Sequence, residues 1–393
     1  MDLHRVVTAA EQRTGSFAER LRELVSIDSG SYSADGVNRV ADALDSRFRE
    51  GGWEVDRRRH RPEAGAQRLG DLVIARVTGS GSHRVLLLCH MDTVFPDGTA
   101  AARPFRVEGN RGLGPGVSDA KAGILAGIEA VDLLRELGID RYASVTFACN
   151  PDEEVGSTFS GPAIRELAEA SDVAYVLEAG RENGDIVSAR KGVTTIRVEL
   201  TGRSAHAGVE PERGRHAVLD AALKTAELQA LNGQVPGATV NVGVLSGGIR
   251  PNVVPDACVM EIDVRAFEES VLAGIRERVM SIVTTPRVAG VAATVQVDIE
   301  HAPMERLPST ERLVALAREI AGEIGFPLRD ASTGGASDAN AIAATGTPVL
   351  DGLGPVGGDD HGPAEWVDLS SVAPRVALLA GMVARADEAL RPS

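Results

Sequence analysis

The feature that most constrains the fold is an alternation of short apolar runs with longer segments of helical periodicity. Nearly continuous runs of Val, Ile, Leu and similar residues lie at 71–78, 84–89, 143–149, 173–177 and 347–350. Between and around them, apolar residues recur at helical spacing at 16–27, 37–50, 120–137, 309–324 and 369–389. Continuous apolar strands are typical of a parallel sheet that is covered by helices on both faces. The sequence therefore predicts an α/β domain built on a mixed, mostly parallel sheet.

A different pattern occupies residues 191–300. Apolar and polar residues alternate at 194–200 and 293–299, as in antiparallel strands with one exposed face. Helical spacing at 214–231 and 268–284 supplies helices to cover the other face. We therefore expect one discontinuous domain of residues 1–190 and 301–393, interrupted by an inserted α+β domain at 191–300.

Charge and cysteine content limit the classes of partner and compartment. The formal net charge is −15, from 56 acidic against 41 basic residues, which disfavours nucleic acid because binding its backbone requires Lys and Arg. The N-terminus lacks the apolar stretch of a signal peptide, and no run approaches the roughly 20 apolar residues of a membrane helix. Cys89, Cys149 and Cys258 are odd in number and form no CxxC pair, which predicts buried free thiols. We expect a cytoplasmic protein without nucleic-acid or membrane partners.

Histidines and acids follow three of the predicted strands directly. His90 and Asp92 follow 84–89, the acids at 152–154 follow 143–149, and Glu178 follows 173–177. Ligands of open α/β sheets bind at the carboxyl ends of the strands. Adjacent carboxylates at such an edge repel one another unless a cation or protons offset them, so the acid run favours a metal. The acid run is the most telling of these signals, with an exposed acidic turn as the alternative. The His–Asp pair, for which a structural role is the alternative, and Glu178 are weak signals when taken singly.

Two Gly-rich loops add further candidate ligands. The loop at 112–121 contains Asp119, which also fits a helix N-cap, and the loop at 357–362 contains His361. Neither GxGxxG nor GxxxxGK[ST] fits the first loop, which disfavours a phosphate site. Two imidazoles and three carboxylates without sulfur suit Zn, or Co or Mn, and match a pair of ions that share one carboxylate. Such a pair polarises a carbonyl and activates water, which is chemistry for hydrolysis.

At these residues the sequence resembles the M20 family of metallopeptidases, in particular its glutamate carboxypeptidase, aminoacylase and desuccinylase groups. The motifs that carry the resemblance are His90-Met91-Asp92-Thr93-Val94, Ser118-Asp119-Ala120-Lys121-Ala122-Gly123, Asp152-Glu153-Glu154-Val155-Gly156-Ser157 and His361-Gly362-Pro363-Ala364-Glu365. The second motif departs from the more common Asp-Met-Lys-Gly-Gly, but the ligand residue is present.

The resemblance implies a role for each residue of the metal centre. Asp119 is expected to bridge two divalent ions, with His90 and Glu178 completing one site and Glu154 and His361 the other. Glu153 is expected to be the general base, and Asp92 is expected to orient His90.

The resemblance also implies a function for the inserted domain, as a lid and as the surface of a homodimer. Ser204-Ala205-His206-Ala207-Gly208 looks like the lid motif whose His reaches the active site of a neighbouring subunit and stabilises the oxyanion. Asn252 and Arg265 look like contacts to the substrate carboxylate. Gly334 and Gly335 resemble the loop that closes over the substrate.

The expected activity is hydrolysis of an amide or peptide bond that releases an amino acid from an N-acyl amino acid or small peptide. Where carboxypeptidases of the group often carry a basic residue before Pro, this chain has His301-Ala302-Pro303, so release of glutamate is not specifically predicted. Two alternatives stay open, a metal-dependent hydrolase of a non-peptide C–N bond and a non-catalytic, metal-stabilised binding protein. Glu153, a carboxylate additional to the ligand set, favours an enzyme.

Overall fold

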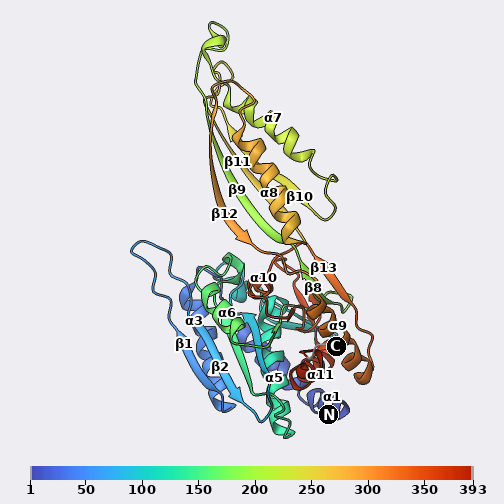
Figure 1. The fold of residues 1–393 in the computed structure, drawn as a ribbon. Helices are drawn as coiled ribbons and strands as arrows, with labels where there is room; N and C mark the ends of the chain where they lie inside the picture. Colours follow the sequence, from blue (N-terminus) through green and yellow to red (C-terminus); the bar gives the residue numbers. More distant parts are fainter. Residues whose placement is uncertain (1, 391–393) are drawn as a thin grey trace. The chain divides into compact units, whose positions relative to one another are not determined.

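The chain folds into two compact units in the computed structural model, which describes residues 2–390 (Figure 1). The first unit consists of residues up to 188 together with 306–332 and those from 337 onward, and the second of Ala189–Glu305 and Thr333–Ala336. The second unit contains the predicted insertion at 191–300. It also includes Thr333–Ala336, a segment that the sequence alone assigns to the first domain. Lys191 N donates to Thr333 O at 3.1 Å and Arg190 Nη1 to Gly335 O at 3.0 Å, and these bonds hold the segment in the second unit.

A six-stranded mixed sheet forms the centre of the first unit, in the order β1-β2-β6-β3-β7-β14. The strands β6, β3, β7 and β14 are parallel, whereas β2 runs antiparallel to both β1 and β6. Their bounds are β1 (Glu54–Arg58), β2 (Leu72–Thr78), β3 (Arg84–His90), β6 (Ser144–Asn150), β7 (Val173–Val176) and β14 (Val349–Leu350). The predicted mostly parallel α/β sheet is confirmed.

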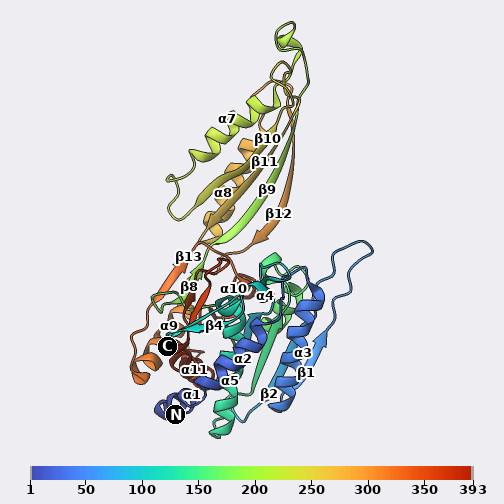
Figure 2. The same cartoon turned by 180° about the vertical axis from the view of Figure 1, so that it is seen from behind.

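Helices cover both faces of this sheet, α6 on one (Figure 1) and α3 and α5 on the other (Figure 2). Apolar side chains of β3 and β6 are buried under them, which explains the continuous apolar runs. The helices of the unit are α1 (Leu3–Glu11), α2 (Thr14–Val25), α3 (Ala34–Glu50), α4 (Thr99–Ala102), α5 (Ala122–Glu136), α6 (Gly161–Glu169), α9 (Pro308–Ile324), α10 (Asp338–Ala343), α11 (Leu369–Ala384) and α12 (Ala386–Leu390).

A small antiparallel sheet of the first unit lies in the order β15-β16-β5-β4. Its strands are β4 (Arg106–Glu108), β5 (Arg111–Leu113), β15 (Gly357–Gly358) and β16 (Trp366–Asp368). Strands of two or three residues are too short to show a period, so this sheet was not predicted from the sequence.

The second unit is a four-stranded antiparallel sheet, β10-β11-β9-β12, with α7 and α8 on one face (Figures 1 and 2). Its elements are β9 (Gly192–Thr201), α7 (Ala217–Gln229), β10 (Thr239–Gly247), β11 (Ala257–Ala266), α8 (Glu269–Thr284) and β12 (Ala292–His301). Alternate residues of β11, such as Met260, Ile262 and Val264, are buried against the helices. The expected α+β insertion with one exposed sheet face is therefore confirmed. The short strands β8 (Ile186–Arg190) and β13 (Asp330–Thr333) pair where the chain passes between the units.

All three cysteines are buried free thiols, as predicted. Within residues 2–390 every helix is too short or too polar to cross a lipid bilayer.

Candidate metal centre

Parallel strands bring three of the predicted ligand segments to one edge of the large sheet. His90 is the last residue of β3 and lies opposite Asn150, the last residue of β6, while Leu88 pairs with Val176 at the end of β7. The acid turn at 152–154 and Glu178 therefore emerge beside His90. Because the strands are parallel, their carboxyl ends meet at the same edge.

The small sheet brings the other two predicted ligands together. Trp366 of β16 pairs with Leu113 of β5. The loop with Asp119 follows β5, and the loop with His361 precedes β16. His361 has a φ of 63°, a left-handed conformation that is uncommon for a residue other than glycine and that often marks a functional site.

Asp119 lies between the two imidazoles. Its Oδ1 is 2.8 Å from His90 Nε2, and its Oδ2 is 2.9 Å from His361 Nε2. Glu178 Oε2 lies 3.7 Å from His90 Nε2, and Glu154 Oε2 lies 3.2 Å from His361 Nε2. The five residues thus form two groups that share one carboxylate, and ligand atoms of His90, Asp119 and Glu154 all lie within 4.8 Å of one another.

Like charge is concentrated at this cluster. Burial raises the pKa of Glu154 to about 8 and also raises the pKa of Glu178. Burial opposes ionisation of Asp119 as well, but hydrogen bonds from His361 and His90 outweigh it and lower the pKa of Asp119. The same hydrogen bond to Asp119 raises the pKa of His361 to about 9. Protons therefore offset the acids here in the way that a cation would.

A divalent metal fits this set of side chains. Glu154 Oε1 is buried and, within the described residues, makes no hydrogen bond, which is costly for a carboxylate oxygen unless a cation is its partner. The donors are imidazole nitrogens and carboxylate oxygens, the ligands of zinc and related divalent ions.

Asp92 connects the end of β3 to the acid turn. This fully buried carboxylate accepts from Ser31 Oγ at 2.7 Å, Glu153 N at 3.1 Å and Glu154 N at 3.2 Å. His90 Nδ1 lies 3.0 Å from the carbonyl oxygen of Asp92 and 3.4 Å from its Oδ1. Asp92 therefore contacts both the imidazole that it was predicted to orient and the turn that carries Glu153.

Glu153 lies on the same turn as Glu154. Burial raises the pKa of Glu153 well above its ordinary value, with contributions from the charges of Glu178, Asp338 and Glu154. A carboxyl group in such surroundings accepts and holds a proton readily, as a general base requires.

Glu365 is a site residue for which the sequence analysis predicted no role. Its side chain is 1% exposed and accepts from three backbone amides of the Asp119 loop, Gly116 N at 2.8 Å, Ser118 N at 2.9 Å and Asp119 N at 3.1 Å. These bonds fix the loop that presents Asp119. Glu365 is part of the His361-Gly362-Pro363-Ala364-Glu365 motif, but its partners are backbone amides about 250 positions away, which no side-chain pattern reveals.

In the second unit, His206 and Asn252 lie side by side. His206 forms a β-bridge with Val253, and Ala207 N donates to Asn252 O at 3.0 Å. His206 is exposed, and its Nδ1 accepts from Gly208 N at 3.2 Å. With Nδ1 accepting this bond, Nε2 is the ring nitrogen that can donate.

Arg265 and the Gly334-Gly335 segment lie together, at the other end of the same sheet. Arg265 Nη1 donates to Gly334 O at 2.8 Å, and Asp263 holds the guanidinium through Nε and Nη2 at 2.8 and 3.0 Å. Arg265 pairs with Val193 of β9, whereas the His206 turn follows Thr201 at the end of that strand. Eight residues of strand separate these ends, which is about 26 Å at the usual rise.

Comparison with known proteins links this geometry to one family. The sequence matches the family described as Peptidase family M20/M25/M40 over residues 86–385. The chain is 29% identical over 381 residues to carboxypeptidase G2 of Pseudomonas sp. (strain RS-16), covering 95% of this chain and 90% of that protein. It is also 29% identical over 261 residues to an N-carbamoyl-L-amino-acid amidohydrolase of Paenarthrobacter aurescens, covering 64% of this chain and 62% of that protein.

A solved structure shares the fold. The crystal structure of the aminopeptidase PepT from Bacillus cereus ATCC 10987 superposes with a TM-score of 0.79 at 22% identity, covering 96% of this chain and 99% of the other. At this identity the likeness shows the architecture alone.

Proposed function

Since the chain belongs to peptidase family M20/M25/M40, a family of hydrolases of peptide and related amide bonds, we propose that it releases an amino acid from an N-acyl amino acid or small peptide. The observation that carries this proposal is Asp119 between two imidazoles, with one carboxylate oxygen toward each. Carboxypeptidase G2, 29% identical over nearly the whole chain, supports an activity at the carboxyl end of the substrate.

We propose that two divalent ions occupy the centre, zinc in the first place and cobalt or manganese as alternatives. His90, Asp119 and Glu178 would hold one ion, and Glu154, Asp119 and His361 the other. When bound, the ions polarise the scissile carbonyl and lower the pKa of the attacking water. The unpartnered Oε1 of Glu154 supports its assignment as a ligand.

Glu153 is the general base of the proposed reaction. Its carboxylate takes a proton from the water as the water oxygen bonds to the carbonyl carbon, and it returns that proton to the nitrogen as the C–N bond breaks. A carboxylic acid and a free amine result. The burial that raises the pKa of Glu153 supports this role, and the contacts of Asp92 to His90 and to Glu153 N support a positioning role for Asp92.

His206 is proposed to donate from Nε2 to the developing oxyanion of a neighbouring subunit. Arg265 lies at the end of the four-stranded sheet at which the chain enters the second unit. His206 follows the opposite end of strand β9, about 26 Å away along the strand. A separation of that length supports the idea that the two residues serve different active sites. We therefore propose a homodimer formed through the second unit.

The substrate carboxylate is proposed to bind Arg265 and the Gly334-Gly335 loop of one subunit. Asn252, which lies beside His206, is proposed to reach the same carboxylate from the neighbouring subunit. A guanidinium has five N–H donors. In Arg265 the Nε–H is shared between both carboxylate oxygens of Asp263, and Nη1 and Nη2 each make one bond, which leaves two N–H donors within the described residues. We also propose a cytoplasmic location, which the three free thiols favour.

The test is a screen of metal-loaded protein against N-acyl amino acids and dipeptides, with detection of the released amine. We expect hydrolysis that a chelator abolishes and added metal restores. An N-carbamoyl amino acid belongs in the panel, because the Paenarthrobacter relative favours such a substrate as the second candidate. Metal binding without cleavage of any of these compounds would support the non-catalytic alternative instead.

A further inference from the structure

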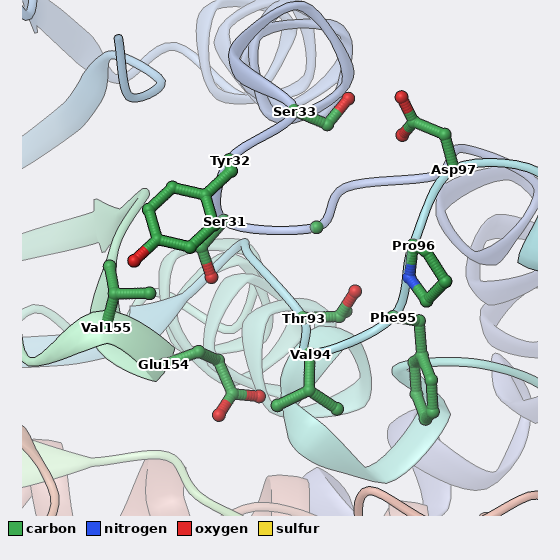
Figure 3. Close-up of a pocket in the computed structure, with 11 residues that line it drawn as sticks. Ser31, Tyr32, Ser33, Thr93, Val94, Phe95, Pro96, Asp97, Glu154 and Val155 are labelled. Carbon is green, nitrogen blue, oxygen red and sulfur yellow. The ribbon is translucent and has the colours of Figure 1, made fainter. Parts of the chain in front are cut away.

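A pocket of about 530 Å³ in the first unit opens beside the candidate metal centre (Figure 3). Its walls come from two segments, Gly30–Ser33 and Thr93–Asp97, together with Glu154 and Val155 of the acid turn. Glu154 belongs both to this wall and to the metal cluster. A group bound in the pocket is therefore adjacent to the centre at which the scissile bond is cleaved.

The two wall segments are tied together, so the pocket is formed before a ligand binds. Ser31 N donates to Thr93 O at 3.2 Å, and Thr93 N donates to Ser29 O at 2.9 Å. Ser31 Oγ is bonded to the buried carboxylate of Asp92. A preformed wall loses little conformational entropy when a ligand binds.

Exposed apolar side chains dominate the surface that a ligand meets. Tyr32 is 64% exposed and Val94 42% exposed, and Figure 3 shows Tyr32 and Val155 on one side of the open space, with Val94 and Pro96 on the other. Large apolar side chains that stay exposed beside a reactive centre are typical of ligand-binding surfaces. The volume lies within the range of small-molecule sites and far exceeds what an acetyl group fills.

The charge of the pocket is acidic. None of its eleven lining residues is Lys, Arg or His, whereas Asp97 and Glu154 are carboxylates. The nearby Arg103 stacks on the ring of Phe95 at 4.4 Å and donates to Gly362 O at 3.0 Å, and it is not part of the wall. Because Glu154 is assigned to a metal ion, Asp97 is the carboxylate of the wall that a second carboxylate on the acyl group would meet. The wall offers no cationic side chain to pair with that group.

We infer that this pocket takes the acyl side of the substrate, and that it selects uncharged apolar or aromatic acyl groups over acetyl and over dicarboxylic acyl groups such as succinyl. The inference rests on the proposed function, in which the amino-acid carboxylate binds residues of the second unit and the acyl group is left for the first. Tyr32 is the main apolar contact, and Asp97 is the residue that disfavours an anionic acyl group.

The test compares acyl groups on one leaving amino acid, the amino acid that the substrate screen identifies. The metal-loaded enzyme is assayed with the benzoyl, acetyl and succinyl derivatives. We expect kcat/KM for benzoyl to exceed that for acetyl by about tenfold or more, the scale of hydrophobic pocket discrimination, and succinyl to be the poorest. Succinyl or acetyl substrates cleaved as fast as benzoyl would overturn the inference while leaving the proposed function intact.

Two variants assign the selectivity to the pocket. Tyr32→Ala should lower the benzoyl-to-acetyl ratio several-fold, and Asp97→Lys should raise the succinyl-to-acetyl ratio about tenfold. Leu307→Ala, an exposed apolar residue at the start of α9, and Glu11→Lys, an exposed acid on α1, are the matched controls and should change neither ratio. Unchanged ratios in both pocket variants would overturn the inference. Absence of cleavage of every N-acyl amino acid and every dipeptide would overturn the proposed function and the inference with it.

Discussion

Removal of the Glu365 carboxylate should destabilise the metal-free protein and weaken metal binding together. Glu365→Ala leaves three backbone N–H groups, those of Gly116, Ser118 and Asp119, without their acceptor. An unsatisfied buried donor costs about 1–3 kcal/mol, so the expected loss in unfolding free energy is about 3–6 kcal/mol after partial relaxation. Because the loop that these bonds fix presents Asp119, metal affinity should fall by about 10- to 100-fold, as for other residues that orient a ligand.

Glu365→Gln is the matched control, because it retains the shape and one acceptor oxygen. Oε1 accepts from Ser118 and Asp119 and Oε2 from Gly116 alone, so an amide oriented to keep the first two bonds loses only the third. The expected loss in unfolding free energy for Glu365→Gln is about 1–3 kcal/mol. Urea denaturation of the metal-free proteins and competition titration with a chromophoric chelator measure the two effects. If Glu365→Ala unfolded at the same urea concentration as wild type and bound metal equally well, the assigned positioning role would be refuted.

Three further predictions concern charge, subunit exchange and substrate binding. In the metal-free protein, burial raises the pKa of Glu154 to about 8 and that of Asp338 to about 7. The folded state therefore holds more protons than the unfolded chain between about pH 4 and 8, and the free energy of unfolding should fall as the pH rises through this range. Urea titrations should show that saturating metal removes most of this loss of stability and that Asp338→Asn lessens it. A pH dependence of stability that metal does not change would contradict the assignment of Glu154 as a metal ligand. Equal mixtures of His206→Ala and Glu153→Gln protein should recover about a quarter of wild-type activity, since random exchange makes half the dimers hybrid with one intact site each. No recovery despite demonstrated subunit exchange would count against the shared site. Arg265→Ala should raise KM by about 10- to 100-fold with a smaller change in kcat, because this is the scale of a lost hydrogen bond to a charged group. An unaltered KM in steady-state kinetics would exclude Arg265 from carboxylate binding.

Secondary structure was predicted best from the sequence where a single physical cause, such as burial in the core, determines the local composition. The apolar runs that became β3 and β6 are buried on both faces, so burial alone determines their composition. The meeting of His90 with Glu154 and Glu178 follows from the parallel order of the strands. The alternation that predicted the second unit persists in β11 as strict alternation of buried residues.

Other features depend on contacts that no local pattern contains. Asp119 and His361 meet because β5 pairs with β16, two strands of three residues each. Glu365 works through backbone amides, and Thr333–Ala336 belongs to the second unit through backbone and guanidinium hydrogen bonds. Such long-range hydrogen bonds leave no periodic signal in the sequence, so the structure was needed to find them.

The two neighbouring acids Glu153 and Glu154 have different roles in the proposed mechanism, one as general base and the other as metal ligand. The decisive measurement is bound metal by elemental analysis alongside turnover, for Glu153→Gln and Glu154→Gln compared with wild type. We predict that Glu153→Gln keeps the wild-type metal content while turnover falls by about 10²- to 10⁴-fold, the usual contribution of a general base. Glu154→Gln should lose about one equivalent of metal, because its carboxylate is assigned to one of two ions. Equal metal loss in both variants, or full metal content in both, would contradict the separation of base from ligand on which the proposed mechanism rests.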